Sequence, residues 1–323
     1  MGEISGHASV VDEQDELQLV ASGIGSADEG GIFLIDGPEE PVRLSDTPST
    51  GMTSWDRGLE FAWLHWNNDD PSVAGEVEVF GSRSRQVIHK IESLREPHSV
   101  IRHGDHLAIV STLRNMIIWV DDDGRLVRQW RAPGSGDCWH INSLTVKNGN
   151  LIASAFGRFT EHRGWAMNNS AAGSGIVFDV ESGEDLLGGL NCPHDPLWID
   201  DSWLVCNSGT KELLRCSADG SVIDRIELAG WTRGLAVGAK KIYVGVSAHR
   251  LLAQEGQAKV VELDRESLML TREWQLPCPE VFALCWVDPL VSRSLAESRQ
   301  TSPAVSEAQR DRSRPSQRSS ARN

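Results

Sequence analysis

The amino-acid sequence predicts an all-β protein folded as a six-bladed β-propeller. Short apolar runs alternate with turns rich in Gly, Asp and Asn, about every eight to twelve residues. His98, His140, His194, Arg233 and Val281 each open such a unit, roughly 40 to 55 residues apart, which is the length of a propeller blade. No long helical pattern interrupts the repeats, so α/β folds are disfavoured.

A propeller blade is a sheet of four short strands, and the last blade, from Val281, runs out of chain. Residues 17–22 and 31–36 read as two strands near the N-terminus. We expect these N-terminal strands to complete the last blade, which closes the ring and removes its exposed edges. Residues 37–53 contain three prolines and predict a loop.

Three segments follow from composition. Residues 1–16 are polar and predict a flexible N-terminus, and residues 17–290 form the β-propeller domain. Residues 291–323 are rich in Ser, Arg, Gln and Pro and almost lack large apolar side chains. They cannot bury enough apolar surface to offset the entropy of ordering, so we expect a disordered basic tail.

The net charge of −15 argues against a nucleic acid or an acidic membrane surface as the partner. The sequence has no leader-like segment and no apolar run of membrane-spanning length, which predicts a cytoplasmic protein. The six cysteines include no C-x-x-C pair and are expected to be reduced thiols. The sequence favours no particular oligomeric state, and a small molecule remains the expected partner.

Residues that open the first strand of each blade should meet at the axis, because these strands line the central channel. Three imidazoles there, from His98, His140 and His194, suit a divalent metal such as Zn, Fe or Mn as cofactor. The same rings suit acid–base catalysis, with His140 and His194 as the catalytic residues. Alternatively, each histidine bonds a neighbouring backbone carbonyl and only plugs the channel.

Further polar and aromatic residues are expected to bind the substrate. Arg233 is suited to hold a carboxylate or phosphate, or to form a salt bridge with Asp195 instead. Trp165 lies in a long loop, residues 157–174, where it could stack on a sugar or simply cover the end of the propeller. The complete predicted set is Arg233, Asn142, Asp195, Trp165, His249 and Arg250.

Several motifs together resemble an uncharacterised family of bacterial β-propeller proteins, a domain of unknown function. They are Pro97-His98, the DCWHIN segment at 137–142, Arg163-Gly164-Trp165, Cys192-Pro193-His194 and the GWTRG segment at 230–234. The resemblance implies the propeller fold and the axial residues, and such proteins can occur beside or fused to glycosyltransferases. It names no substrate.

Two positions depart from the family pattern. Ser99 stands where relatives commonly have Asp, and Ala283 follows Phe282 where they tend to have an acidic residue. Both departures weaken the case for a metal site in this chain.

The leading hypothesis is an axial His/Arg pocket that binds a small anionic or sugar-containing ligand, with acid–base or metal-assisted lyase, epimerase or hydrolase chemistry. The first alternative is a non-catalytic ligand-binding module in a glycan or cell-envelope pathway. The second is a protein-interaction module in which the histidines are structural. Fold alone does not choose among these hypotheses.

Overall fold

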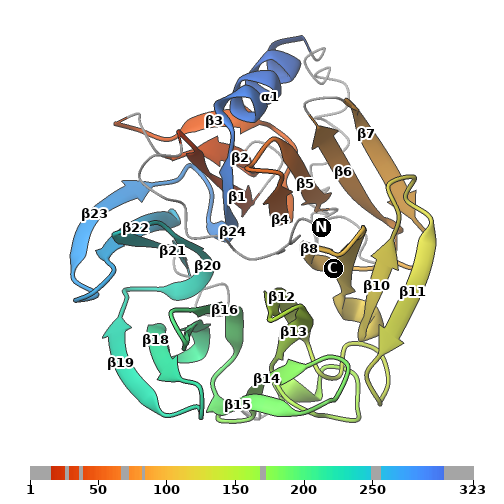
Figure 1. Cartoon of the computed structure of the whole chain (residues 1–323), viewed down its shortest axis with the longest axis vertical. Helices are drawn as coiled ribbons and strands as arrows, with labels where there is room; N and C mark the ends of the chain where they lie inside the picture. Colours follow the sequence, from red (N-terminus) through yellow and green to blue (C-terminus); the bar gives the residue numbers. More distant parts are fainter. Residues whose placement is uncertain are drawn as a thin grey trace, which may run out of the picture.

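The computed structural model describes residues 16–25, 29–35, 39–66, 73–81, 84–167, 172–248 and 256–301. Within them, four-stranded antiparallel sheets form six blades arranged in a ring around a common axis (Figure 1). The predicted six-bladed propeller is therefore confirmed. None of the helices in the described part of the chain is both long and apolar enough to span a lipid bilayer.

Five blades each use four consecutive strands, of which the first lies innermost and the last outermost (Figure 1). The strands are β4 (Ser49–Trp55), β5 (Glu60–His65), β6 (Gly75–Gly81), β7 (Ser84–Ile91); β8 (Pro97–His103), β9 (His106–Ser111), β10 (Met116–Val120), β11 (Leu126–Arg131); β12 (Ile141–Lys147), β13 (Asn150–Ala155), β14 (Gly175–Asp179), β15 (Asp185–Leu190); β16 (Pro193–Ile199), β17 (Ser202–Asn207), β18 (Glu212–Ser217), β19 (Val222–Glu227); and β20 (Trp231–Val237), β21 (Lys241–Ser247), β22 (Lys259–Asp264), β23 (Leu270–Gln275).

The sixth blade joins the two ends of the chain. Its innermost strand is β24 (Glu280–Val287), which pairs with β1 (Gln18–Ile24), and β2 (Gly31–Leu34) and β3 (Val42–Ser45) follow outward. In this register Val20 lies opposite Cys285. Closure of the ring by N-terminal strands is thus confirmed, and it removes the open edges that would otherwise flank the first and last blades.

Two sequence-based expectations need correction. The loop predicted over residues 37–53 is wrong, because β3 and the start of β4 fall within it. The prediction of disorder over residues 291–301 is also wrong, because helix α1 (Pro289–Thr301) lies there and packs beside β3 (Figure 1). Proline suits the first turn of a helix, and Val291 and Leu295, one turn apart, are buried against the sixth blade. Residues 1–15 and 302–323 lie outside the described part of the chain.

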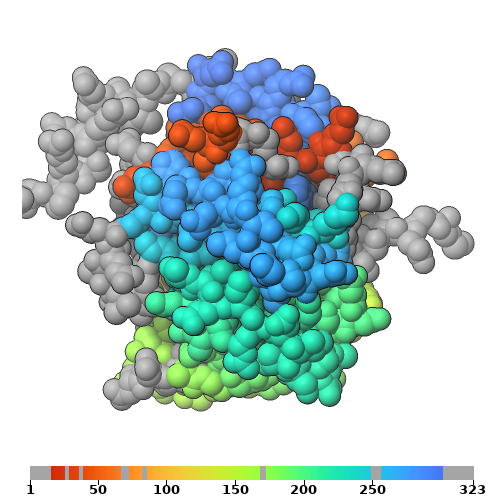
Figure 2. Space-filling model, turned by 90° about the vertical axis from the view of Figure 1, so that its left-hand side faces the viewer, coloured from red at the N-terminus to blue at the C-terminus, as the bar shows by residue number. Residues whose placement is uncertain are grey.

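The hydrophobic core lies between neighbouring blades rather than at one centre. Large buried side chains such as Trp63, Phe178 and Trp203 extend from one blade toward the next. Seen from the side, the teal and blue outer segments of two neighbouring blades form a continuous wall beneath α1 (Figure 2). This packing holds the innermost strands rigidly around the channel, where the candidate site lies.

Candidate functional site

Each of the six innermost strands shifts its register near the beginning of the strand, which is the mark of a β-bulge. A bulge leaves residues without a direct partner opposite and turns their side chains to new directions. The residues at these shifts are Thr50 and Gly51, His98 and Ser99, Asn142, Asp195 and Pro196, Arg233 and Gly234, and Phe282. One level of the channel thus has irregular backbone in every blade.

At this level the structure brings the predicted axial residues together. The rings of His98 and His140 lie 5.2 Å apart, and Phe156 separates His140 from His194, with ring distances of 4.3 and 5.4 Å. Trp165 packs on His140 at 4.3 Å and also contacts Phe156, at a ring distance of 5.2 Å. We call these five side chains, His98, His140, Phe156, Trp165 and His194, the histidine layer.

The three histidines do not share one backbone position, although their spacing suggested it. His98 and His194 each follow a proline, which in turn follows a residue with positive φ, Glu96 or Cys192. His140 itself has a positive φ of 51° and stands one residue before β12. A non-glycine residue in this region is strained, and such strain is often found at functional sites.

Hydrogen bonds to Nδ1 fix the tautomer of all three rings. The Nδ1 atoms of His98 and His194 face the backbone carbonyls of Glu96 at 3.0 Å and Cys192 at 3.1 Å, as the plug alternative expected. His194 Nδ1 also lies 2.8 Å from the Ser208 hydroxyl, whose own hydrogen goes to the Thr232 carbonyl. Because these partners accept from the ring, Nδ1 carries the hydrogen in both rings. The Nδ1 of His140 instead donates to the carboxylate of Asp137 at 3.0 Å. In the neutral rings, Nε2 is therefore the basic nitrogen.

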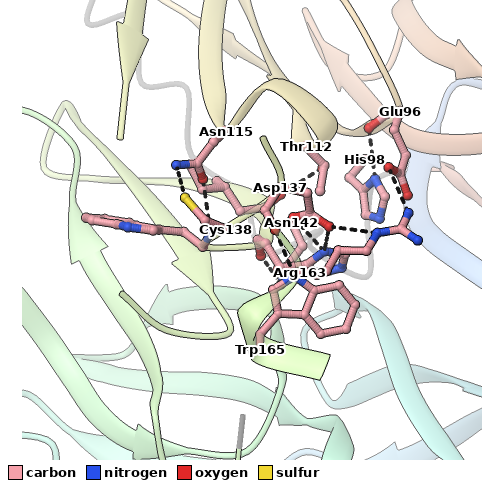
Figure 3. A network of polar contacts seen from close by, with 12 residues as sticks. Glu96, His98, Thr112, Asn115, Asp137, Cys138, Asn142, Arg163 and Trp165 are labelled. Atoms are coloured by element: carbon pink, nitrogen blue, oxygen red, sulfur yellow. Dashed lines mark hydrogen bonds and ion pairs between the residues drawn. The ribbon is translucent and has the colours of Figure 1, made fainter. Parts of the chain in front are cut away.

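Asp137 is the functional candidate that sequence reasoning did not single out. Its side chain is fully buried, and its carboxylate also lies 3.7 Å from Arg163, which reaches on to Glu96 at the same distance (Figure 3). Its backbone carbonyl accepts from the Trp165 indole at 3.1 Å. The available signal was the Asp placed three residues before His140, because an Asp that orients an imidazole is a recurrent catalytic arrangement.

Burial and neighbouring charges perturb two groups at the axis. Burial lowers the pKa of His194 well below its usual value, and the nearby Arg233, His140 and His98 lower it further. Burial raises the pKa of Asp195, while the Arg233 guanidinium and a 2.7 Å hydrogen bond from the Gly234 amide oppose that rise. Burial thereby keeps His194 neutral. The guanidinium of Arg233 and the carboxylate of Asp195 stabilise each other's charge.

A cavity of about 530 Å³ adjoins the histidine layer and runs along the innermost strands of all six blades. We call it the axial cavity. His98, Asp195 and Arg233 line it, whereas His140 and His194 are not among its lining residues. Its volume lies within the range of small-molecule sites.

The remaining predicted residues have mixed outcomes. Asn142 is buried, donates to the His140 carbonyl and accepts from Ser154 at 2.6 Å, so its amide serves the backbone around the layer. Trp165 covers His140. His249 and Arg250 lie outside the described residues. Among the residues that the structure describes, no group of three His, Cys, Asp or Glu is arranged to hold a metal ion, so the predicted metal role of His98, His140 and His194 is not carried further.

A family model described as a domain of unknown function (DUF4915) matches residues 84–272. Similar solved structures include a nidogen/laminin complex, with a TM-score of 0.62 and 9% identity over 84% of this chain and 98% of that chain. A protein of unknown function from Bacteroides caccae has a TM-score of 0.57 and 12% identity over 84% and 99% of the two chains. The calcium-binding protein regucalcin from Agrobacterium tumefaciens has a TM-score of 0.52 and 14% identity, over 75% of this chain and 78% of that chain. These identities show a shared fold alone, and no curated protein matches the chain.

Proposed function

Because this chain belongs to the DUF4915 family, whose description assigns no activity, we propose a function from its axial site: the channel binds a small anionic or sugar-containing ligand. The observation that carries this proposal is the axial cavity, which has a guanidinium and an imidazole at one end. Arg233 would clamp an anionic group, since its planar fork matches carboxylate and phosphate oxygens. His98 lines the same cavity, and its Nε2, which has a lone pair in the neutral ring, would accept a hydrogen bond from a hydroxyl of the ligand.

The test is a thermal-shift panel of organic acids, sugar phosphates and sugar nucleotides with the full chain. A ligand that binds only the folded protein raises its melting midpoint. Arg233→Lys keeps the charge but removes the fork, and it should abolish the rise. Arg272→Lys is the matched control, because Arg272 also stacks on an aromatic ring, Trp274, but on an outer strand. No rise in the wild type, or an equal rise in Arg233→Lys, would contradict the proposal.

We extend the proposal to acid–base chemistry because the hydrogen bond from His140 to Asp137 orients the imidazole as a general base requires. The buried Asp137 carboxylate accepts its Nδ1 hydrogen, so a proton taken by Nε2 gives an imidazolium paired with that carboxylate. His194, held neutral by burial, is the second candidate base. This arrangement suits removal of a proton from a carbon or hydroxyl of the ligand, as in a lyase or epimerase.

A non-catalytic binding module is the second candidate function, favoured by one observation: neither His140 nor His194 lines the axial cavity. Proton exchange separates the two candidates. A ligand found in the panel is incubated with the protein in D₂O, and its carbon-bound hydrogens are followed by NMR. Catalytic exchange should disappear in His140→Asn and Asp137→Asn, whereas a binding module exchanges nothing although the ligand binds.

A further inference from the structure

We propose that the ligand of the axial cavity is an uncharged sugar, with its hydroxyls toward the innermost strands of three adjacent blades and the C–H face of its ring toward the other three. This inference rests on the proposed function and narrows it to one of the two ligand classes named there. Three observations support it: the charge balance of the cavity wall, the pairing of charges at the inner end, and the unequal distribution of hydroxyl side chains around the wall.

The charged side chains that line the axial cavity balance one another. They are three arginines and three aspartates, namely Arg57, Arg102, Arg233, Asp56, Asp105 and Asp195. Arg102 also donates to Asp122 at 2.8 Å, and the neutral ring of His98, whose Nδ1 donates to the Glu96 carbonyl, adds no charge. A phosphate or carboxylate is held by a surplus of cationic donors, which the described wall does not have. An uncharged ligand leaves the balance as it is.

The inner end of the cavity shows the same balance at close range. The guanidinium carbon of Arg233 lies 3.2 Å from the centre of the Phe282 ring, and the charge of Asp195 acts on it. Asp195 also accepts from the Gly234 amide at 2.7 Å and from the Ser143 hydroxyl. An anion bound here would meet the Asp195 carboxylate as well as the guanidinium, and like charges at short range repel each other.

A sugar hydroxyl suits this pair of charges better than an anion does. One hydroxyl can donate to a carboxylate and accept from an N–H group at the same time. It can therefore join Arg233 and Asp195 without disturbing their charge balance. Arg233 then contacts hydroxyls of the ligand together with Asp195, instead of clamping an anion.

Hydroxyl side chains line one half of the axial cavity. Among the described lining residues, every hydroxyl comes from β4, β8 or β12, which are neighbours in the ring, and none comes from β16, β20 or β24 (Figure 1). They are Thr53, Ser54, Ser99, Ser143 and Thr145. Trp55 and Ile101 give this half some apolar surface as well, so the two halves differ in their hydroxyls rather than in apolar content.

Two of these hydroxyls, on Ser54 and Ser99, belong to half-exposed residues, whereas the other three are nearly buried. Ser54 donates to the Trp286 carbonyl at 2.6 Å, so its oxygen can accept from a ligand. Ser99 accepts from the Leu144 amide at 3.1 Å, so its hydrogen can be donated to a ligand. This half of the wall thus offers both an acceptor and a donor, as neighbouring hydroxyls of a sugar require.

The opposite half presents mainly carbon to the cavity. Apart from the charged pair, its half-exposed lining residues are Leu197, Ala283 and Trp286. The Trp286 indole already donates to the Val237 carbonyl at 3.2 Å, so it offers a ligand the surface of its ring. A sugar ring has hydroxyls around its edge and C–H groups on its faces, and burying a C–H face against tryptophan is favourable. The two sides of a sugar therefore match the two halves of the wall.

The experiment titrates the full chain at pH 7.5 with glucose, galactose and mannose. Glucuronate and glucose 6-phosphate are the charged counterparts, and cyclohexanol is a ring almost without hydroxyls. Binding is followed by tryptophan fluorescence, because Trp55 and Trp286 line the cavity, and by ligand-observed NMR. At least one hexose should bind at least about ten-fold more tightly than either charged counterpart, because the added charge meets Asp195 without a spare cation. Cyclohexanol should bind at least about ten-fold more weakly than that hexose.

Asp195→Asn tests the charge balance, because it removes the negative partner of Arg233. It should raise the affinity for glucuronate relative to glucose at least about ten-fold. Asp219→Asn is the matched control, since Asp219 likewise accepts from a backbone amide and a serine hydroxyl, those of Ser221 and Ser217, but in an exposed outer turn. It should leave this ratio unchanged. If Asp195→Asn does not fold, the comparison of glucose with glucuronate in the wild type still decides the question.

Serine variants test the hydroxyl half of the wall. Ser99→Ala should weaken hexose binding about two- to ten-fold through the loss of one hydrogen bond, and Ser54→Ala makes the same test on the neighbouring blade. Ser182→Ala, in an exposed turn between β14 and β15, is the matched control and should change nothing. Hexose binding that is unchanged in both cavity variants would contradict the placement of the sugar hydroxyls.

The outcomes separate this inference from the proposed function. Tighter binding of an uncharged hexose, weakened in Arg233→Lys and in the serine variants, supports both. Equal or tighter binding of glucuronate, glucose 6-phosphate or an organic acid of the thermal-shift panel, still dependent on Arg233, overturns the uncharged sugar and leaves the proposed function standing. Binding of none of these compounds, or binding indifferent to Arg233→Lys, overturns both.

Discussion

The channel has two different regions. The histidine layer lies at the starts of β8, β12 and β16, where side chains hold one another through ring contacts and through hydrogen bonds to fixed acceptors. A few residues further along, all six innermost strands surround the axial cavity. The first region is filled by the protein itself, and the second leaves room for another molecule.

The difference shows how one architecture separates rigidity from binding. Polar groups in the histidine layer are buried and paired, so their loss should cost stability first. Side chains that line the axial cavity contact few protein atoms on the side that faces the cavity. Substituting one of them should therefore weaken ligand binding more than it lowers the stability of the fold. The predictions below test this division, starting with the largest expected effect.

Asp137→Ala should lower the free energy of unfolding by about 3–5 kcal/mol, because it leaves the buried His140 Nδ1 and the Arg163 guanidinium without their carboxylate. Urea denaturation followed by circular dichroism measures the loss. Asp185→Ala is the control, since its ion pair with Arg158 is partly exposed and should contribute about 1 kcal/mol or less. Equal losses of unfolding free energy in both variants would show that the buried Asp137–His140 pair stabilises the fold no more than an exposed ion pair does.

The propeller could be predicted from the sequence because turns and apolar runs recur with a spacing of one blade. This recurrence does not depend on which other side chains surround them. It could not predict β4, whose sequence STGMTSW has few large apolar residues, since an innermost strand borders a channel. Helix α1 was missed because its buried side has only two large apolar residues, Val291 and Leu295, with the small residues Ser292 and Ala296 beside them, within a segment of polar composition.

The location of His98, His140, His194 and Arg233 near the axis was predictable because each stands at or next to the start of an innermost strand, although the three histidines differ in backbone position there. The role of Asp137 was not predictable in the same way. It depends on the loop that carries Arg163 and Trp165 folding back onto the Asp137 carbonyl, with the Arg163 amide donating at 2.8 Å and the indole at 3.1 Å. A tertiary contact of this kind produces no periodic pattern in the sequence.

A pair of leucines in one hydrophobic cluster compares the cavity wall with the core. Leu235→Ala should cost about 2 kcal/mol, at the low end for a buried leucine, because its side chain already borders an open cavity that water can enter. Leu213→Ala, fully buried in the same cluster, should cost about 1–2 kcal/mol more, because it creates a new enclosed void. Both values come from urea denaturation, and a reversed order would argue against an open cavity.

The histidine layer should also weaken as the pH falls. The folded-state pKa of His194 lies below the unfolded value of 6.5, so the unfolded chain binds the proton more readily. The contribution of His194 is fully present above pH 6.5 and is lost as the pH drops toward its folded-state pKa. The slope from this one group is at most about 1.4 kcal/mol per pH unit. Unfolding free energies of the wild type and His194→Asn, measured between pH 7.5 and about 5, should converge as the pH falls; parallel curves would contradict the lowered pKa.

The smallest effect is expected at Arg163, which lies beside the histidine layer at the surface. Arg163 has a side chain that is 50% exposed, and it lies 3.7 Å from both Asp137 and Glu96. Solvent screens such contacts, so Arg163→Gln should change the free energy of unfolding by about 0–1 kcal/mol. The matched variant Arg158→Gln, which removes a partly exposed ion pair with Asp185, should have a similar effect. A loss near that of Asp137→Ala would instead show that Arg163 is needed to hold the Asp137 carboxylate in place beside His140.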